Sequence, residues 1–354
     1  MEKYQIIQKL GSGSFGIVWK AFNKQTHETV AIKKLSLTYE SSSSVIIIKR
    51  EVKSLMFNKH PNIVSLKEVI SENKIIFLVF EYMQGSLYDV MINRSIKTAP
   101  FSEAEIRHVC YQILQGLACM HQNGYIHRDL KPENLLVSDY VIKIGDLGSA
   151  RETDDQKPYT HNVTTSWYRA PEVFLRSPVY GSAVDMWAVG AIMAELFTFQ
   201  PLFPGSSEVN VMHEICSVLG TPTEGSWSEG LELARNMKYR FPELPGVRFS
   251  ELLPSACPAA VNLIGTLLSW SPFARPTAVE ALQHPFFHGC YRIPRSVPIV
   301  DTDVSIPAVF KLAMVREMLK KKPSLKKSCT CAHHDDDDDD IINMLPEYPF
   351  EFMK

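Results

Sequence analysis

Eight consecutive residues, His127–Asn134, read HRDLKPEN and bring together side chains suited to proton transfer and metal binding. The carboxylate of Asp129 could accept the proton of a hydroxyl group as its oxygen attacks phosphorus. Asn134 could bind a magnesium ion against the phosphates of a nucleotide, and Lys131 lies between the two as a further candidate catalytic residue. A base and a metal ligand at this spacing predict phosphoryl transfer.

A glycine-rich segment near the N-terminus offers a place for the phosphates of the nucleotide. Its glycines separate two apolar runs, 4–10 and 17–21, which are typical of the two strands of a hairpin. Glycine has no Cβ atom and therefore lets backbone amides approach phosphate oxygens closely. The pattern alone is weak evidence, since ordinary hairpins and dinucleotide-binding segments also contain it. The candidate nucleotide-binding residues here are Leu10, Gly11, Ser12, Gly13, Ser14, Phe15, Gly16 and Val18.

Lys33 ends a short apolar run, Val30–Lys33, that predicts a strand after the hairpin. Its ammonium group could pair with the α- and β-phosphates of a nucleotide. Glu51, within a predicted helix over 45–58, is the natural partner that would hold this ammonium group in place. The glycine-rich segment, Lys33, Glu51 and residues 127–134, which form the catalytic loop of such enzymes, follow one another as in the eukaryotic protein kinases, which this sequence resembles.

The resemblance implies roles for further residues, with ATP and Mg²⁺ as the cofactors. Asp146 would bind Mg²⁺, and Leu147, at the place where kinases usually carry phenylalanine, would pack beneath the helix of the paired glutamate and tune the active arrangement. Glu172 and Arg275 would form a buried ion pair, and Asp185 would brace the catalytic loop. The residues implied to surround the adenine are Ala31, Phe80, Glu81, Met83 and Leu136. Among them, Glu81 and Met83 would meet the adenine edge through their backbone groups.

The expected fold is α+β and bilobal, with a small β-rich N-lobe over 1–83 and a larger helical C-lobe over 84–288 that together form a protein kinase domain. A chain of 354 residues with 45% hydrophobic content can bury the core that such a fold needs. The remaining 289–354 is predicted to be a disordered tail, because prolines interrupt it and a lysine-rich block and a run of six aspartates follow one another.

Particular segments narrow the resemblance to the group that contains the cyclin-dependent and MAP kinases: WYRAPE from Trp167, PLFPGSSE from Pro201 and LGTP from Leu219. LELARNMKYRFP at 231–242 is similar to the male-germ-cell-associated kinase family, especially to its plant members of the cyclin-dependent kinase F type. The resemblance covers about 4–287. It implies a serine/threonine kinase that acts on protein sites followed by proline, with Arg169 organising the pocket for that proline.

Regulation is where this sequence departs from those families. Their activation segment usually carries a Thr-x-Tyr pair, but here Thr160 is followed by His161 and Asn162, and Ser166 replaces the arginine that would hold a phosphotyrosine. We therefore expect phosphorylation of Thr160 alone, by an upstream kinase, to activate the enzyme. The phosphate would bind three arginines through charge-assisted hydrogen bonds, namely Arg50, Arg128 and Arg151.

Two alternatives stay open. A true cyclin-dependent enzyme is disfavoured by the helix sequence VIIIKREVKSL, which lacks the PSTAIRE-type segment that grips cyclin, so we expect cyclin independence. A pseudokinase acting as a scaffold is disfavoured because every residue of the expected catalytic set is present: Lys33, Glu51, Asp129, Asn134 and Asp146.

Composition excludes several other classes of protein. The net charge of −2 makes no electrostatic case for binding nucleic acid, and no apolar run is long enough to predict a membrane partner. The seven cysteines form no even framework and are expected to be reduced thiols, as in the cytoplasm and/or nucleus. The expected partners are protein substrates and an activating kinase, and the protein itself is expected to be a monomer.

Overall fold

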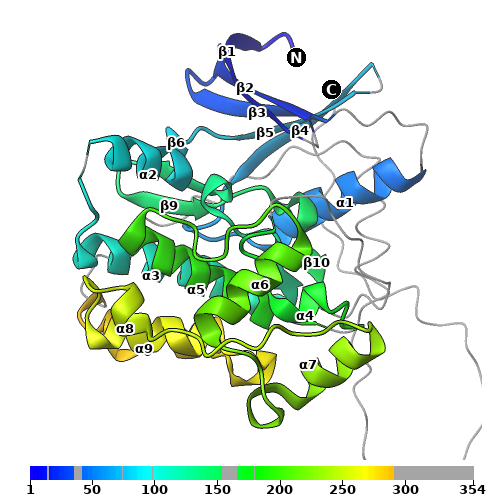
Figure 1. The fold of residues 1–354 in the computed structure, drawn as a ribbon. Coiled ribbons are helices and arrows are strands. Elements are labelled where there is room, and N and C mark those ends of the chain that lie inside the picture. The colour runs from blue at the N-terminus through cyan, green and yellow to red at the C-terminus, as the bar shows by residue number, and fades with distance from the viewer. Residues whose placement is uncertain are drawn as a thin grey trace, which may run out of the picture. The chain divides into compact units, whose positions relative to one another are not determined.

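Five antiparallel strands form the N-terminal sheet, in the order β1-β2-β3-β5-β4. They are β1 (Tyr4–Gly13), β2 (Gly16–Asn23), β3 (Thr29–Leu35), β4 (Leu66–Glu72) and β5 (Ile75–Glu81). Figure 1 shows this sheet at the top and the helix α1 (Ser42–Phe57) below it on one side. The computed structural model describes residues 1–13, 16–35, 42–73, 75–97, 99–153, 166–178 and 180–290.

Small and branched side chains give this sheet its buried face. Ala21, Val30, Ile32 and Val79 are each at most 1% exposed and form one cluster with Tyr4. Buried and partly buried residues alternate along most of β3, as expected for a strand whose successive side chains point to opposite faces.

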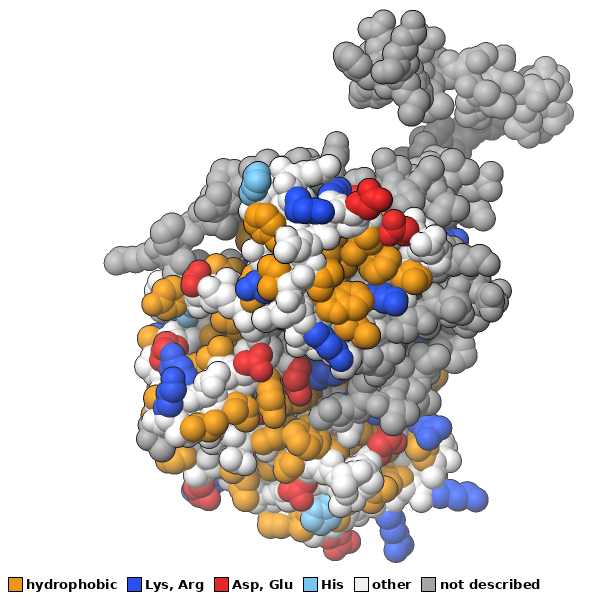
Figure 2. All heavy atoms as spheres, turned by 90° about the horizontal axis from the view of Figure 1, so that it is seen from above, with side chains coloured by type: hydrophobic (Ala, Val, Ile, Leu, Met, Phe, Trp, Pro, Cys, Tyr) orange, Lys and Arg blue, Asp and Glu red, His pale blue; other side chains and the backbone are white. Residues whose placement is uncertain are grey.

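The exposed surface of the N-terminal part is mixed in character, unlike the apolar buried face of the sheet. Figure 2 views the molecule from above and shows lysines or arginines, acidic residues and apolar side chains interspersed, without one prevailing charge. Strand β1 contributes Ile6 and Ile7, which are about half exposed. Single apolar residues at a surface are ordinary and call for no partner.

Helices and short strands make up the larger C-terminal part. The helices are α2 (Leu87–Ile96), α3 (Glu103–Gln122), α4 (Pro171–Phe174), α5 (Ala183–Thr198), α6 (Glu208–Leu219), α7 (Glu224–Asn236), α8 (Phe249–Leu252), α9 (Pro258–Leu267) and α10 (Ala278–Leu282). The strands are β6 (Gly85–Ser86), β7 (Tyr125–Ile126), β8 (Leu135–Ser138), β9 (Val141–Ile144) and β10 (Arg151–Glu152). The 3-10 turns are η1 (Pro132–Asn134), η2 (Leu147–Ser149), η3 (Pro272–Ala274) and η4 (Pro285–Phe287).

Helix α5 lies at the centre of this part, packed against α3 and α9. All residues from Val184 to Leu196 are buried, because a helix that is apolar on every side is stable only inside a core. Gly190 permits the close approach of α9: a Cβ atom there would lie 2.9 Å from side-chain atoms of both Leu267 and Leu268. The helix therefore provides a rigid base on which the chemically important loops rest.

The predicted α+β fold, with a small β-rich part and a larger helical part, is confirmed, although several bounds differ. The helix predicted over 45–58 begins at Ser42 and ends at Phe57, where the side chain of Asn58 turns back to donate to the Ser54 carbonyl. Both hairpin strands are longer than their apolar runs, because backbone pairing continues up to Gly13 and Gly16. The predicted tail lies outside the described residues from 291 onward, so its boundary stays a prediction.

Among the helices of the described ranges, none is both long enough and apolar enough to cross a bilayer.

Candidate active site

Asp185, at the start of α5, holds the backbone of the catalytic loop. Its two carboxylate oxygens accept hydrogen bonds from the amides of His127 and Arg128, each at 2.8 Å, and His121 Nε2 lies 2.9 Å from Oδ2. Arg128 adopts a left-handed conformation with φ of 71°, which the two amide bonds help to hold. Burial acts to raise the pKa of Asp185, but the contact with His121 and the amide donors outweigh it and keep the pKa below its ordinary value. The bracing role predicted for Asp185 is confirmed.

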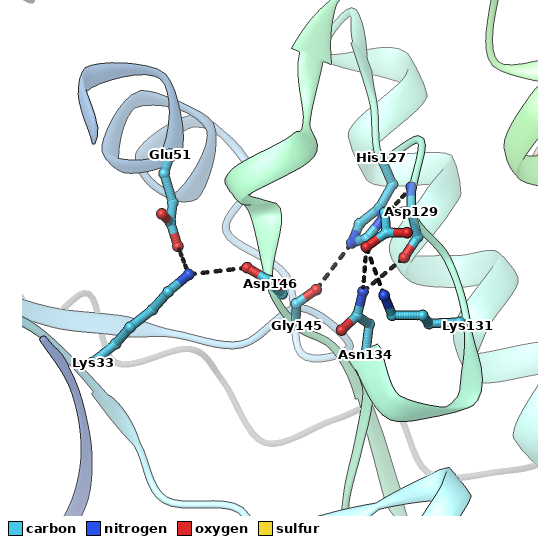
Figure 3. A network of polar contacts seen from close by, with 8 residues as sticks. All are labelled: Lys33, Glu51, His127, Asp129, Lys131, Asn134, Gly145 and Asp146. Atoms are coloured by element: carbon cyan, nitrogen blue, oxygen red, sulfur yellow. Dashed lines mark hydrogen bonds and ion pairs between the residues drawn. The ribbon is translucent and has the colours of Figure 1, made fainter. Parts of the chain in front are cut away.

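The catalytic loop orders the groups around Asp129, as Figure 3 shows. Lys131 Nζ lies 2.9 Å from Asp129 Oδ2, and Asn134 Nδ2 donates to the Asp129 carbonyl at 2.7 Å and to Oδ2 at 3.2 Å. Because the amide nitrogen of Asn134 points at Asp129, its oxygen is directed elsewhere and is the atom that could bind a cation. His127 supports the loop, with Nε2 2.9 Å from the Gly145 carbonyl and Nδ1 accepting from the Asp129 amide.

Lys33 forms ion pairs with two acidic residues from different elements. Its Nζ lies 2.7 Å from Glu51 Oε1 on α1 and 2.9 Å from Asp146 Oδ1, which confirms the predicted partner and adds the candidate metal ligand (Figure 3). Burial alone would lower the pKa of Lys33, but the two negative charges raise it above its ordinary value. For Asp146 the two effects have the opposite signs: burial would raise its pKa, but the charge of Lys33 outweighs burial and lowers the pKa. The site therefore holds a fixed ammonium group beside an ionised carboxylate.

Leu147 and Gly148, which directly follow Asp146, belong to a turn beside the helix that contains Glu51. Leu147 is 1% exposed, and η2, which it begins, packs against α1. A Cβ atom at Gly148 would lie 3.3 Å from Asp146 Oδ1 and 3.5 Å from Glu51 Oε2, so a side chain there would crowd the ion-paired carboxylates. The turn that Leu147 begins thus lies against the helix of Glu51, in agreement with the predicted packing.

The candidate phosphate-binding residues lie at the turn between β1 and β2. Gly13 pairs with Gly16, and Gly11 pairs with Val18, whereas Ser14 and Phe15 lie outside the described residues. Gly16 has φ of 139°, and a Cβ atom there would lie 1.9 Å from the Lys34 carbonyl oxygen. Only glycine fits this position, because the backbone of β2 passes so close to β3 here. Leu10 and Ser12 lie on β1 beside these glycines.

The candidate adenine-binding residues come from three strands and from the segment that follows β5. Ala31 on β3 is the register partner of Phe80 on β5, and Leu136 lies on β8. Glu81 ends β5, and Met83 follows it. The Glu81 amide already donates to the Ser65 carbonyl at 3.1 Å, which leaves its own carbonyl as the group that could meet adenine.

The three arginines predicted to receive a phosphate come from α1, the catalytic loop and β10. Arg128 Nε donates to the Ser149 carbonyl of η2 at 2.7 Å, and α1, which carries Arg50, packs against the same turn. Arg151 is 5% exposed and is the register partner of Ile126, two residues before Arg128. Thr160 lies outside the described residues, so its contact with these arginines stays a prediction.

Helix α4, which contains Glu172, is anchored by a buried ion pair with Arg275. Arg275 Nη1 and Nη2 lie 2.7 and 2.8 Å from the two carboxylate oxygens of Glu172, and both side chains are at most 3% exposed. The same guanidinium group donates to three backbone carbonyls and lies over the Trp187 ring. This two-bond pairing confirms the predicted ion pair. Arg169, nearby, is held by Glu208 of α6 at 3.1 Å.

Sequence reasoning missed Glu195. It lies on α5, is 4% exposed, and accepts a hydrogen bond from the Tyr168 hydroxyl group at 2.7 Å. Burial raises the pKa of Glu195 to about 7. Besides Asp185, Glu195 is the other acidic residue in this apolar helix. Because a buried polar group needs a hydrogen-bond partner, its position in the sequence already indicated a specific partner.

This burial predicts a pH-dependent stability. An unfolded Glu195 ionises near 4.5 and the folded one near 7, so the free energy of unfolding should fall by up to about 3 kcal/mol as pH rises across that window. Glu195→Gln keeps an acceptor for Tyr168 but cannot ionise, and should lose this part of the pH dependence. Urea unfolding at pH 5 and pH 8 measures it, with exposed Glu232→Gln as the control. Equal pH dependence in wild type and Glu195→Gln would contradict the assignment.

The fold and the site together define a protein kinase. Residues 4–287 match the family of the protein kinase domain, and the chain belongs to that family. It is 54% identical over 297 residues to cyclin-dependent kinase F-4 of rice (Oryza sativa subsp. japonica), which covers 84% of this chain and 64% of the relative. It is 52% identical to cyclin-dependent kinase F-3 of rice, over 83% of this chain and 67% of the relative.

Animal relatives lie in the same group. The serine/threonine-protein kinase MAK of mouse (Mus musculus) is 48% identical over 288 residues, which are 81% of this chain and 46% of the relative. The resemblance to the cyclin-dependent kinase F and MAK proteins is thereby confirmed. The chain spans only about half to two thirds of the length of these curated relatives.

Proposed function

We propose that the protein is an ATP-dependent serine/threonine kinase that phosphorylates protein sites followed by proline. The observation that carries the proposal is the assembled pair of networks in Figure 3: Lys33 is bound to Glu51 and Asp146, while Asp129 is bound to Lys131 and Asn134. The names of the relatives, serine/threonine-protein kinase among them, support the acceptor class.

The chemistry of the ligand set suits ATP and Mg²⁺. The Asn134 amide oxygen and the Asp146 carboxylate are hard oxygen ligands of the kind that Mg²⁺ prefers. When bound there, Mg²⁺ would offset the negative charge of the phosphates. Gly11 lies at the β1–β2 hairpin with no heavy atom of the described residues, beyond its chain neighbours, within 4 Å of the place of a Cβ atom, so its backbone can be approached by a phosphate group.

Each residue of the site would then have its own role in phosphoryl transfer. Asp129 accepts the proton of the substrate hydroxyl group, and Lys131, 2.9 Å from that carboxylate, places a positive charge beside the transferred phosphoryl group. Lys33, fixed by Glu51, holds the remaining phosphates. The positions are set in advance by Asp185, so little reorganisation is needed during the reaction.

Preference for proline after the acceptor rests on the segment of Arg169. Its side chain bonds Glu208 and its amide donates to the Ser166 carbonyl, so this part of the backbone is held against α6. A proline has no amide donor and therefore suits a surface that offers it no hydrogen-bond acceptor. Phosphate transfer from labelled ATP to paired Ser-Pro and Ser-Ala peptides tests this: equal rates would rule out the preference for proline.

Activation through Thr160 is the regulatory part of the proposal. A phosphate there would bind Arg50, Arg128 and Arg151, and so connect α1, the catalytic loop and β10. Thr160→Ala should lower the rate of phosphate transfer about tenfold or more, as expected for lost hydrogen bonds to a charged group. The comparison is with wild-type protein before and after phosphatase treatment. Undiminished activity in Thr160→Ala, or no effect of the phosphatase, would contradict this mode of activation.

A requirement for cyclin is the second candidate, and the names of the rice relatives favour it. Full activity of the purified protein on its own would reject it, whereas copurification with a cyclin would support it.

A further inference from the structure

We propose that Lys143 is a positioning residue for ATP, which ties the adenine-binding segment at the end of β5 to strand β9. The inference rests on the proposed function, since it concerns how the same nucleotide is held. It assigns a role to the side chain of Glu81, whose backbone alone was expected to take part in binding.

The tie is an ion pair between the two parts of the kinase domain. Lys143 Nζ on β9 lies 2.8 Å from Glu81 Oε1 at the end of β5, although 62 residues separate them in the sequence. The two side chains are only 16% and 24% exposed, so water and salt screen the pair less than they screen an ordinary surface pair.

Ser65 closes a second connection around the same carboxylate. Its amide donates to Glu81 Oε1 at 2.8 Å, and its carbonyl accepts from the Glu81 amide at 3.1 Å. The residues just before it are bonded to β9: the Val64 amide donates to the Ile144 carbonyl at 2.9 Å, and the Ile144 amide donates to the Asn62 carbonyl at 2.8 Å. The end of β5 is therefore joined to β9 both directly and through residues 62–65, which precede β4.

Strand register connects this tie to the adenine. Lys143 lies directly opposite Leu136 in the β8–β9 pair, so the two side chains occupy the same face. Leu136 is held in place from another side, since a Cβ atom at Gly145 would lie 2.9 Å from its Cδ1 atom. The ion pair thus joins β9, the strand paired with the one that carries the expected floor of the adenine site, to the residue whose carbonyl is expected to meet the adenine edge.

Loss of the tie should act on nucleotide binding. Without the ammonium group, the end of β5 keeps its hydrogen bonds to Ser65 but loses its direct bond to β9, and it should spend less time in the geometry that bonds adenine. When only a fraction of the molecules is competent, the apparent Kd rises by the inverse of that fraction.

The test measures Kd for a fluorescent derivative of MgADP, which needs no catalysis. Lys143→Met should raise Kd about fivefold, and Lys143→Arg should restore most of the affinity. The control is Lys67→Met, which removes a more exposed ion pair of similar length, 2.9 Å to Glu28, that involves neither Glu81 nor Lys143. Thermal unfolding of each variant shows whether a change in Kd merely follows a change in stability.

The outcomes separate this inference from the proposed function. A raised Kd in Lys143→Met but not in Lys67→Met, with recovery in Lys143→Arg, supports the inference. Unchanged Kd in Lys143→Met, or equal changes in both methionine variants, overturns the inference and leaves the proposed kinase intact. A wild-type protein that binds no MgADP overturns both.

Discussion

The Asp129→Asn variant is expected to transfer phosphate at least about 100-fold more slowly than the wild type, because it loses the general base. The substitution keeps the size of the side chain, and the Asn134 bond to the Asp129 backbone carbonyl does not involve the replaced oxygen. The network of Lys33, Glu51 and Asp146 is separate from it. The loss should therefore appear in the rate of transfer of γ-labelled phosphate to a peptide, while the affinity for MgADP changes little.

A matched control is Asp139→Asn, on the hairpin between β8 and β9. Asp139 has φ of 52° and accepts from the Gln84 side chain, and asparagine tolerates this conformation and keeps an acceptor. Its activity should equal that of the wild type. Comparable transfer by Asp129→Asn and Asp139→Asn would show that Asp129 is not the base, and no transfer by any of the proteins, even with Thr160 phosphorylated, would favour a pseudokinase.

The second large effect is expected in stability. Arg275→Leu should lower the free energy of unfolding by about 3–5 kcal/mol, because it leaves the buried Glu172 carboxylate, only 3% exposed, without its charged partner. Backbone carbonyls that the guanidinium group satisfies would also lose their donor. Urea unfolding followed by fluorescence measures the change.

Two further variants sharpen this measurement. Arg235→Leu removes an ion pair with Glu224 whose side chains are 68% and 72% exposed, and it should cost less than about 1 kcal/mol. Adding Glu172→Gln to Arg275→Leu removes the stranded charge and should recover part of the stability. A loss in Arg275→Leu as small as in Arg235→Leu would mean that this ion pair does not anchor the segment.

Chemistry carried by neighbouring residues was predictable from the sequence. Asp129, Lys131 and Asn134 lie within six positions of one another, so their side chains come together in one loop once Asp185 holds its backbone. The glycines of the β1–β2 turn were equally predictable from their spacing. The structure gives the reason for one of them, because the conformation of Gly16 admits no other residue. The family resemblance supplied the long-range pairs, of which Lys33 with Glu51 is one.

Only the tertiary structure decided which polar side chains of distant segments form hydrogen bonds or ion pairs with one another. Glu195 meets Tyr168 across 27 positions, and Lys143 meets Glu81 across 62, yet nothing in the local sequence of either names its partner. Hydrophobic periodicity indicates which face of an element is buried, but not which polar group lies opposite. Pairing of buried charges depends on how helices and strands pack, because an ion pair forms only where both groups leave water at the same place. The sequence by itself therefore determined the residue types of the candidate active site, and packing determined what holds them in position.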